Sequence, residues 1–314
     1  MKNAQAPYEV FSGVVEIPGV GVGSVTDVSK RTGVTVVLLP EGACGAVDVA
    51  GGAPATRETP VLDPSNTIQG PDAVVLSGGS AVGLRTADGV IEGLQELGRG
   101  VAVGTIHIPI VVAAAIFDMD EGKAQAPTVD DGMAGLREAA TGIHTIREGR
   151  QGAGTGATVG KGLGLAARMA GGQGAVTLRT ADGLLVSAIM VVNAVGSVLD
   201  ESGLVLAGPQ VGGVAQNTTD LWAGIAARLG PGGATTIGTV LTNAQLSKAE
   251  LQRVARMSHD GLARAIEPVH TPWDGDTIFA LSVGSQPDDV SRVGALAARA
   301  VAMAVRRAVQ LANA

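Results

Sequence analysis

Apolar positions along the chain fall into two kinds of run, which predict both strands and helices. Short β-branched runs bounded by glycine, proline or a charged residue are typical of buried strands. They occur at residues 34–39, 73–76, 184–193, 236–242 and 277–283. Longer runs with helical spacing predict helices at 81–97, 248–264 and 289–311, the second of them preceded by the N-cap residue Ser247. The pattern therefore predicts an α/β or α+β chain, which we interpret as one domain spanning residues 1–314.

The segment 200–233 breaks this pattern, because it is polar and rich in glycine. It leads through Gly-Pro-Gly-Gly-Ala at 230–234 directly into Thr235. We expect a mobile connector here, since accessible loops of this composition are preferred sites of chain cleavage. Cleavage before Thr235 would leave residues 1–234 and a shorter piece, 235–314. That shorter piece would begin with a hydroxyl residue at the head of a strand.

Composition narrows the function classes. Apolar residues make up 46% of the chain but only 2 Trp, 1 Tyr and 3 Phe are present, so aliphatic side chains must fill the core. The 47 glycines show no Gly-X-Y period, which indicates close backbone packing rather than a collagen-like chain. A net charge of −7 without basic runs makes nucleic acid an unexpected partner.

Location and redox state follow from similar observations. The lone Cys44 has no internal disulfide partner, and the start of the chain lacks the apolar run of a secretory signal. The richest apolar stretch, 106–119, falls short of the ~20 residues that a membrane helix needs. We therefore expect a cytoplasmic protein with no membrane partner and no cofactor.

Two carboxylates, Asp274 and Asp276, flank a glycine just before the strand predicted at 277–283. Side chains at i and i+2 of a strand face the same way, so the pair could share a proton, raise each other's pKa or orient an amine. A polar turn that caps the strand fits the spacing equally well. A metal site is not expected, because His270 alone among the histidines lies in this segment.

Three other segments offer candidate groups. The glycine-rich run 151–161 resembles a phosphate loop, but Gly162 follows Lys161 where Ser or Thr is required. Lys161 could instead donate to a substrate carbonyl, or it could be an ordinary surface lysine. Asn193 ends a predicted strand, where its amide could donate to an oxyanion. The Gly-Gly-Ser segment ending at Ser80 could be an anion site, a nucleophile elbow or a tight strand-to-helix turn. The turn is the default interpretation, because Ser80 lacks the Gly-x-Ser-x-Gly frame.

Read together, these segments resemble the L-aminopeptidase/D-esterase family, which includes β-aminopeptidases and 6-aminohexanoate (nylon) oligomer endo-hydrolases. The resemblance spans nearly the whole chain. It is carried by IPGVGVG at 17–23, GAVDVAGGAPATRET at 45–59, LSGGSA at 76–81, GAGTGA at 152–157, VVNA at 191–194, TTI at 235–237 and the block from HDGLA at 259 to DGD at 274–276.

The resemblance implies an enzyme in which Thr235 cleaves its own preceding peptide bond, after Ala234, and becomes the N-terminal nucleophile of the shorter chain. It further implies that Asp274 and Asp276 orient the nucleophile and bind the substrate amine, that Lys161 assists, and that Asn193 helps to form the oxyanion hole.

The sequence departs from the family pattern at two positions. Ala234 stands where close relatives often have Asn, and Phe117 stands where several have a Tyr that donates a hydroxyl to the site. The first departure bears on the speed of self-cleavage, and the second removes one hydrogen-bond donor.

The fold implied by the resemblance is an α+β four-layered αββα sandwich like that of N-terminal-nucleophile hydrolases, with distinct connectivity, assembled into homo-oligomers of four or more copies. The implied activity is that of an aminopeptidase or amidase on short peptides, amino-acid amides or esters. Hydrolysis of 6-aminohexanoate oligomers is an alternative, and an inert self-associating relative is an alternative of another class.

Overall fold

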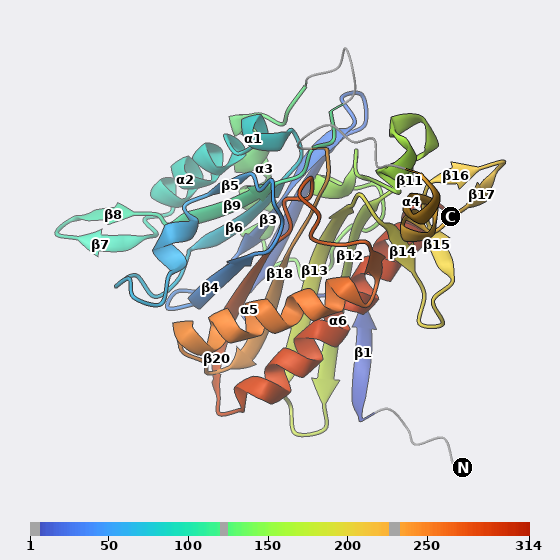
Figure 1. Cartoon of the computed structure of the whole chain (residues 1–314). Coiled ribbons are helices and arrows are strands. Elements are labelled where there is room, and N and C mark those ends of the chain that lie inside the picture. Colours follow the sequence, from blue (N-terminus) through green and yellow to red (C-terminus); the bar gives the residue numbers. More distant parts are fainter. Residues whose placement is uncertain (1–6, 120–124, 226–232) are drawn as a thin grey trace.

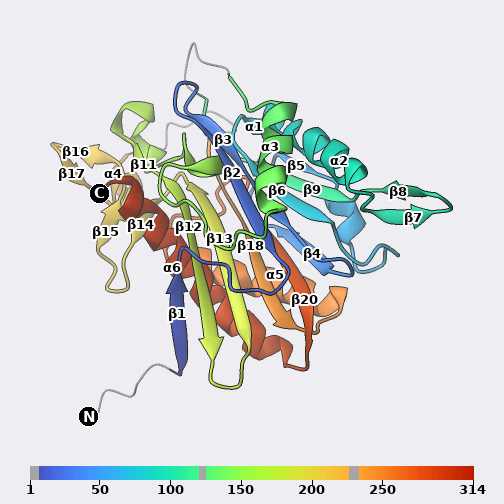
Figure 2. The ribbon, with the colours of Figure 1, turned by 180° about the vertical axis from the view of Figure 1, so that it is seen from behind.

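Two β-sheets packed face to face form the centre of the molecule (Figures 1 and 2). The computed structural model describes residues 7–119, 125–225 and 233–314. The first sheet has six strands, in the order β1 (Tyr8–Ser12), β12 (Gly172–Thr180), β13 (Leu185–Asn193), β18 (Thr235–Ala244), β20 (Thr277–Gln286) and β4 (Cys44–Val49). The second has five, in the order β2 (Gly21–Asp27), β3 (Thr32–Leu38), β6 (Ala73–Ser77), β9 (Val111–Ala115) and β5 (Thr56–Arg57).

Helices cover the outer face of each sheet and complete four layers. The first sheet is covered by α5 (Lys248–Ala263) and α6 (Val290–Ala312), and the second by α2 (Thr86–Glu96) and α3 (Val129–Ala139). Three apolar clusters fill the spaces between adjacent layers, and the middle cluster joins the inner faces of the two sheets. The expected αββα sandwich is confirmed.

Pairing in the first sheet is antiparallel except between β18 and β20, which run parallel. Its register places Asn193, the last residue of β13, opposite Thr235, the first residue of β18. Thr277 at the start of β20 lies opposite Ile237, two residues further along β18. The ends of three neighbouring strands therefore meet at one edge of the sheet.

The strands predicted from the sequence are all present, with ends that differ by at most three residues. The helix predicted at 248–264 begins after Ser247, whose hydroxyl and the Glu250 carboxylate form a reciprocal capping box. Asp289 caps α6 by accepting from two backbone N–H groups. The other six strands of the two sheets, β1, β2, β4, β5, β9 and β12, and helix α3 were not predicted.

The prediction of one continuous helix at 81–97 is wrong, because the structure has two helices there, α1 (Ser80–Gly83) and α2. The division follows Gly83, where the Thr86 hydroxyl donates to the Gly83 carbonyl at 2.8 Å and ends the first turn. A Cβ on Gly83 would lie 1.8 Å from the carbonyl oxygen of Gly78, so this turn requires glycine.

The connector expected at 200–233 is also corrected, since its described part has regular structure. It contains β15 (Val205–Ala207), β16 (Gln210–Val211), β17 (Val214–Ala215) and α4 (Thr218–Gly224), and residues 226–232 lie outside the described residues. Ser197 of β14 (Ser197–Leu199) ties the segment down, because its hydroxyl donates to Gln216 O and accepts from Thr218 N, each at 2.9 Å. Polar composition here reflects hydrogen bonding within the fold.

The remaining elements are short. They are β7 (Val101–Val103), β8 (Ile106–Ile108), β10 (Thr158–Val159), β11 (Met169–Ala170), β19 (Ile266–Glu267) and the 3₁₀ turns η1 (Thr59–Leu62), η2 (Gly152–Gly154), η3 (Lys161–Leu163) and η4 (Leu165–Ala167). Across the three described ranges, no helix is both long enough and apolar enough to cross a bilayer.

Glycine allows the layers to approach closely, as the composition predicted. A Cβ on Gly21 or Gly23 of β2 would lie 2.0 Å from a backbone carbonyl oxygen of α3. Backbone contact of this kind compensates for the scarcity of aromatic side chains in the core.

Candidate functional site

Thr235 lies at the sheet edge where β13, β18 and β20 meet. It is 4% exposed, and the preceding Ala234 is 1% exposed. The Thr235 hydroxyl donates a short hydrogen bond to the carbonyl oxygen of Ala234. A buried hydroxyl is thus in contact with the peptide bond that the sequence predicts to be cleaved.

A second donor reaches the same carbonyl. The backbone N–H of Gly275 donates to Ala234 O at 3.2 Å. A Cβ on Gly275 would lie 2.9 Å from Thr235 Oγ1, so a side chain at this position would crowd the hydroxyl. Gly275 was not singled out from the sequence, although a glycine between two aspartates is compatible with a close backbone approach.

Lys161 is buried beside this bond, with 2% of its surface exposed, so the alternative of a surface lysine is wrong. Its ammonium donates to Gly233 O at 2.6 Å, to Asn193 Oδ1 at 2.9 Å and to Asn193 O at 3.0 Å. It therefore links the end of β13 to the residue two positions before Thr235. A buried ammonium requires such polar partners.

Asn193 uses its side chain differently from the prediction in the uncleaved chain. Its Oδ1 accepts from Lys161 and from the backbone N–H of Thr158, the latter at 3.0 Å, while its Nδ2 donates to the carbonyl of Phe117 at 2.9 Å. Phe117 thus contacts the site through its backbone, and it lines a small cavity together with Asp118, Lys161 and Gly233.

Asp118 was not singled out from the sequence. Its carboxylate accepts from Gly79 N and from the Thr32 hydroxyl, both at 2.7 Å. Burial raises the pKa of Asp118, while these hydrogen bonds and the charge of Lys161 oppose that shift. The sequence feature that could have identified Asp118 is its position as an acidic residue just after a buried apolar strand.

Asp274 and Asp276 both reach the site, but not by strand alternation. They precede β20, which begins at Thr277, so the rule that i and i+2 face the same way does not apply. Asp274 accepts from Val195 N at 3.2 Å and from the Thr271 hydroxyl at 2.5 Å. Asp276 accepts from Thr236 N at 2.7 Å and from His270 Nδ1 at 2.8 Å. Each carboxylate therefore has its own set of donors.

The two carboxylates still interact electrostatically. Burial, and secondly the neighbouring charge of Asp276, raise the pKa of Asp274 to about 6. Hydrogen bonds from Thr271 and Val195 and the charge of Lys161 oppose the shift. Both residues are 1% exposed, so in the uncleaved chain their oxygens serve backbone and side-chain donors rather than solvent.

The remaining predictions concern features outside this cluster. The turn at Ser80 is confirmed as a tight connection from β6 to α1, with φ of 53° at Ser80 and 80° at Gly79. Within the described ranges, no group of three or more His, Cys, Asp or Glu side chains is placed to hold a metal ion.

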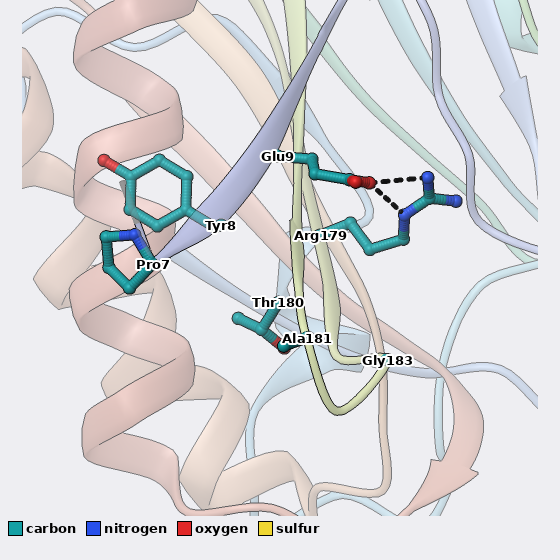
Figure 3. A pocket seen from close by; sticks show the side chains of 7 residues that line it. All are labelled: Pro7, Tyr8, Glu9, Arg179, Thr180, Ala181 and Gly183. Carbon is teal, nitrogen blue, oxygen red and sulfur yellow. Dashed lines mark hydrogen bonds and ion pairs between the residues drawn. The ribbon is translucent and has the colours of Figure 1, made fainter. Parts of the chain in front are cut away.

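A more open pocket lies at the opposite end of β13, around the turn from β12 (Figure 3). Its lining includes Tyr8, Glu9, Arg179, Thr180 and Gly183, and none of the residues around Thr235 contributes to it.

The arrangement of layers is shared with solved structures of hydrolases. A Burkholderia sp. β-aminopeptidase superposes with a TM-score of 0.69 at 19% identity, covering 93% of this chain and 84% of that one. The L-aminopeptidase D-Ala-esterase/amidase from Ochrobactrum anthropi gives 0.67 at 18% identity, covering 94% and 85%. The fold is therefore that of aminopeptidases of the N-terminal-nucleophile hydrolase type.

Sequence comparison then identifies the family. The family model for peptidase family S58 matches residues 13–314, and this chain belongs to that family of hydrolases. An uncharacterized aminopeptidase of Mycobacterium tuberculosis is 44% identical over 264 residues, which cover 81% of this chain and 74% of that protein. A 6-aminohexanoate-oligomer endohydrolase of Paenarthrobacter ureafaciens is 33% identical over 274 residues, covering 85% and 74%.

Proposed function

We propose that the chain is the precursor of a self-cleaving amide hydrolase whose nucleophile is Thr235. The observation that carries the proposal is the buried Thr235 hydroxyl in contact with the Ala234 carbonyl, to which Gly275 N–H also donates. Membership of peptidase family S58 supports the same reading.

Self-cleavage would begin with attack of Thr235 Oγ on the carbonyl carbon of Ala234. The hydroxyl proton passes to the Thr235 nitrogen, the C–N bond breaks, and an ester joins Ala234 to the Thr235 side chain. Gly275 N–H stabilises the negative charge that develops on the carbonyl oxygen. Water then hydrolyses the ester, which leaves a carboxylate on Ala234 and a free α-amine on Thr235.

In the mature enzyme this α-amine acts as the general base for its own hydroxyl. An unperturbed α-amino group has a pKa of about 7.7–8.0, which suits a base near neutral pH. The ammonium of Lys161 lies beside the reacting bond and contributes positive charge there. Asp276 holds the backbone next to Thr235, and release of residue 234 opens the position where a substrate carbonyl is bound.

The substrates we propose are short peptides, amino-acid amides or esters, in line with the aminopeptidases among the relatives. Hydrolysis of 6-aminohexanoate oligomers is the second candidate, because an endohydrolase of these oligomers is 33% identical over most of the chain. Both substrates contain an amide carbonyl that Thr235 would attack. We further propose that several copies of the chain assemble.

Denaturing mass analysis tests the proposal directly. The purified chain should separate into residues 1–234 and 235–314, and sequencing of the smaller piece should start at Thr235. The cleaved protein is then incubated with aminoacyl amides and with 6-aminohexanoate oligomers, and hydrolysis is measured. A start at another residue refutes the assignment of the nucleophile. A chain that stays whole and hydrolyses neither substrate supports an inert relative.

A further inference from the structure

His270 is held against the site by three features. Its backbone has a φ of +56°, a left-handed conformation uncommon for residues other than glycine. Its backbone N–H and its Nδ1 both lie within hydrogen-bond distance of Asp276 Oδ2, at 3.1 and 2.8 Å. In the tautomer protonated at Nδ1, the ring donates to this carboxylate oxygen.

The other oxygen of Asp276 connects this contact to the nucleophile. Asp276 Oδ1 accepts from the backbone N–H of Thr236 at 2.7 Å. Thr236 is joined directly to Thr235, so the position of this carboxylate restricts the position of the Thr235 backbone. His270 contacts the other oxygen of the same carboxylate.

A second histidine packs behind the first. The ring of His259 on α5 meets the His270 ring edge-on, with 4.8 Å between centroids. His259 Nε2 lies 3.2 Å from the carbonyl oxygen of Asp48 and 3.6 Å from its carboxylate, which also pairs with Arg256 at 3.1 Å. Burial, and secondly the neighbouring His270, lower the pKa of His259 and favour its neutral form. The His270 ring is thus confined between α5 and Asp276.

We propose that His270 is a positioning residue for Thr235, acting through the hydrogen bond from its Nδ1 to Asp276. This inference rests on the proposed function, because it concerns the geometry of the same nucleophile. The bond keeps Asp276 aligned with Thr236 N–H, and thereby keeps Thr235 Oγ in line with the carbonyl that it attacks. Precise alignment of a nucleophile contributes strongly to rate, so loss of the bond should reduce turnover more than substrate binding.

Asn and Gly both tolerate a positive φ, so placing each of them at position 270 tests the side-chain donor without requiring a change of backbone conformation. His270→Asn places an amide N–H near the position of Nδ1, whereas His270→Gly removes the donor. We expect His270→Gly to slow self-cleavage and to lower kcat by about tenfold, with KM changed by less than about twofold. His270→Asn should stay within about threefold of the parent in both reactions. Mass time courses give the cleavage rate, and kinetics on the cleaved fraction give kcat and KM.

The outcomes separate this inference from the proposed function. A parent chain that neither cleaves itself nor hydrolyses amides defeats the proposed function. A functional parent whose Asn and Gly variants show equal rates defeats only the role of His270, and a changed melting temperature would then assign it a purely structural role. If His270→Gly does not fold, the isosteric pair His270→Asn and His270→Asp replaces it. The Asp variant lacks a donor and must then show the lower kcat, and equal values would overturn the proposal.

Discussion

The two ends of strand β13 have opposite characters. At one end Thr235, Asn193 and Lys161 are nearly inaccessible, and their polar atoms contact one another or nearby backbone groups. At the other end a pocket of about 600 Å³ opens to solvent, with the ion pair of Arg179 and Glu9 at its rim (Figure 3). Few buried polar side chains line the larger pocket, whereas the buried polar side chains around Thr235 border little free volume.

This difference indicates which end of the strand has polar groups positioned for a reaction. Desolvated groups at fixed positions interact more strongly than exposed ones, and their pKa values shift, as that of Asp274 does. Solvent at the open pocket screens the exposed ion pair. The larger cavity therefore lies away from the nucleophile that we propose.

The largest effect should come from Thr235→Ala. Without the hydroxyl, neither self-cleavage nor the mature nucleophile can form, so we expect a loss of at least about a thousandfold in both reactions. Mass analysis and amide hydrolysis assays measure the two losses. Thr236→Ala is the control, because its hydroxyl has no partner among the described residues and its loss should cost less than about threefold. Parental activity in Thr235→Ala would redirect the search, with Ser80 as the first candidate.

Two buried lysines allow a sharper comparison. Lys248, which is 5% exposed, resembles Lys161 in being buried and in donating to three oxygens. Its acceptors are the carbonyl oxygens of Val61, Asn66 and Ile68, and it lies away from Thr235. Lys161→Met should slow self-cleavage by about a hundredfold, because it removes a charge beside the reacting bond.

Lys248→Met is the matched control for that substitution. It should lower the free energy of unfolding by roughly 1–3 kcal/mol while changing the cleavage rate by less than about threefold. Mass time courses and denaturant unfolding test both variants. Equal cleavage rates in the two would mean that Lys161 serves stability alone.

Asp274→Asn and Asp276→Asn should each lower kcat/KM by about ten- to a hundredfold, since each removes a buried charge-assisted hydrogen bond. The two aspartates hold the same loop and interact electrostatically, so the double variant should lose less than the product of the single losses. A double-mutant cycle on kcat/KM measures this, with circular dichroism to check the fold. Additive losses below about threefold would show that the pair only caps the strand.

The raised pKa of Asp274 predicts a smaller effect, on stability. With a pKa of about 6 in the folded chain and an ordinary value of 3.8, the carboxyl of Asp274 binds its proton more tightly in the native state than in the unfolded state. Its stabilising contribution is complete below about pH 3.8 and is lost as the pH rises to about 6. The free energy of unfolding should therefore fall across this window by on the order of 1–3 kcal/mol more in the parent than in Asp274→Asn. Denaturant unfolding at several pH values measures the difference, and parallel curves would contradict it.

The smallest effect belongs to the open pocket. Arg179→Ala removes an exposed ion pair with Glu9, for which a stability change below about 1 kcal/mol is usual. Cleavage and turnover should stay within about twofold, as measured by the same assays. A tenfold loss would mean that this end of the sheet takes part in function and would remove the contrast between the two ends.

Much of the fold could be predicted from local pattern. The strands ending at Asn193 and beginning at Thr235 and Thr277 are β-branched runs, and α5 carries its cap at Ser247. The layering required the family resemblance, because no local signal says which strands are neighbours. The segment 200–233 was misjudged because its polar residues form hydrogen bonds within the fold, which composition does not reveal.

The sequence was sufficient to name most residues of the candidate site but not the contacts that they make. Thr235, Lys161 and the two aspartates were all named from sequence, yet the expected alternation of Asp274 and Asp276 was wrong. Gly275 escaped notice because its contribution is a backbone N–H, which every residue except proline has. The role of Asn193 as a partner of Lys161 depends on a contact across 32 positions of sequence, which spacing cannot show.

The order of strands in the first sheet has a consequence for the lifetime of a cleaved molecule. Strands β18 and β20, which follow Thr235, are inserted between β13 and β4, which precede it. The two pieces would thus stay interleaved after the bond is cut, each completing the other's sheet. Denaturation would release them as separate chains, and renaturation would become a second-order encounter that depends on concentration. The strands would then assemble only once, in the intact chain before cleavage. The mature protein would persist because its two pieces dissociate slowly, not because they can refold.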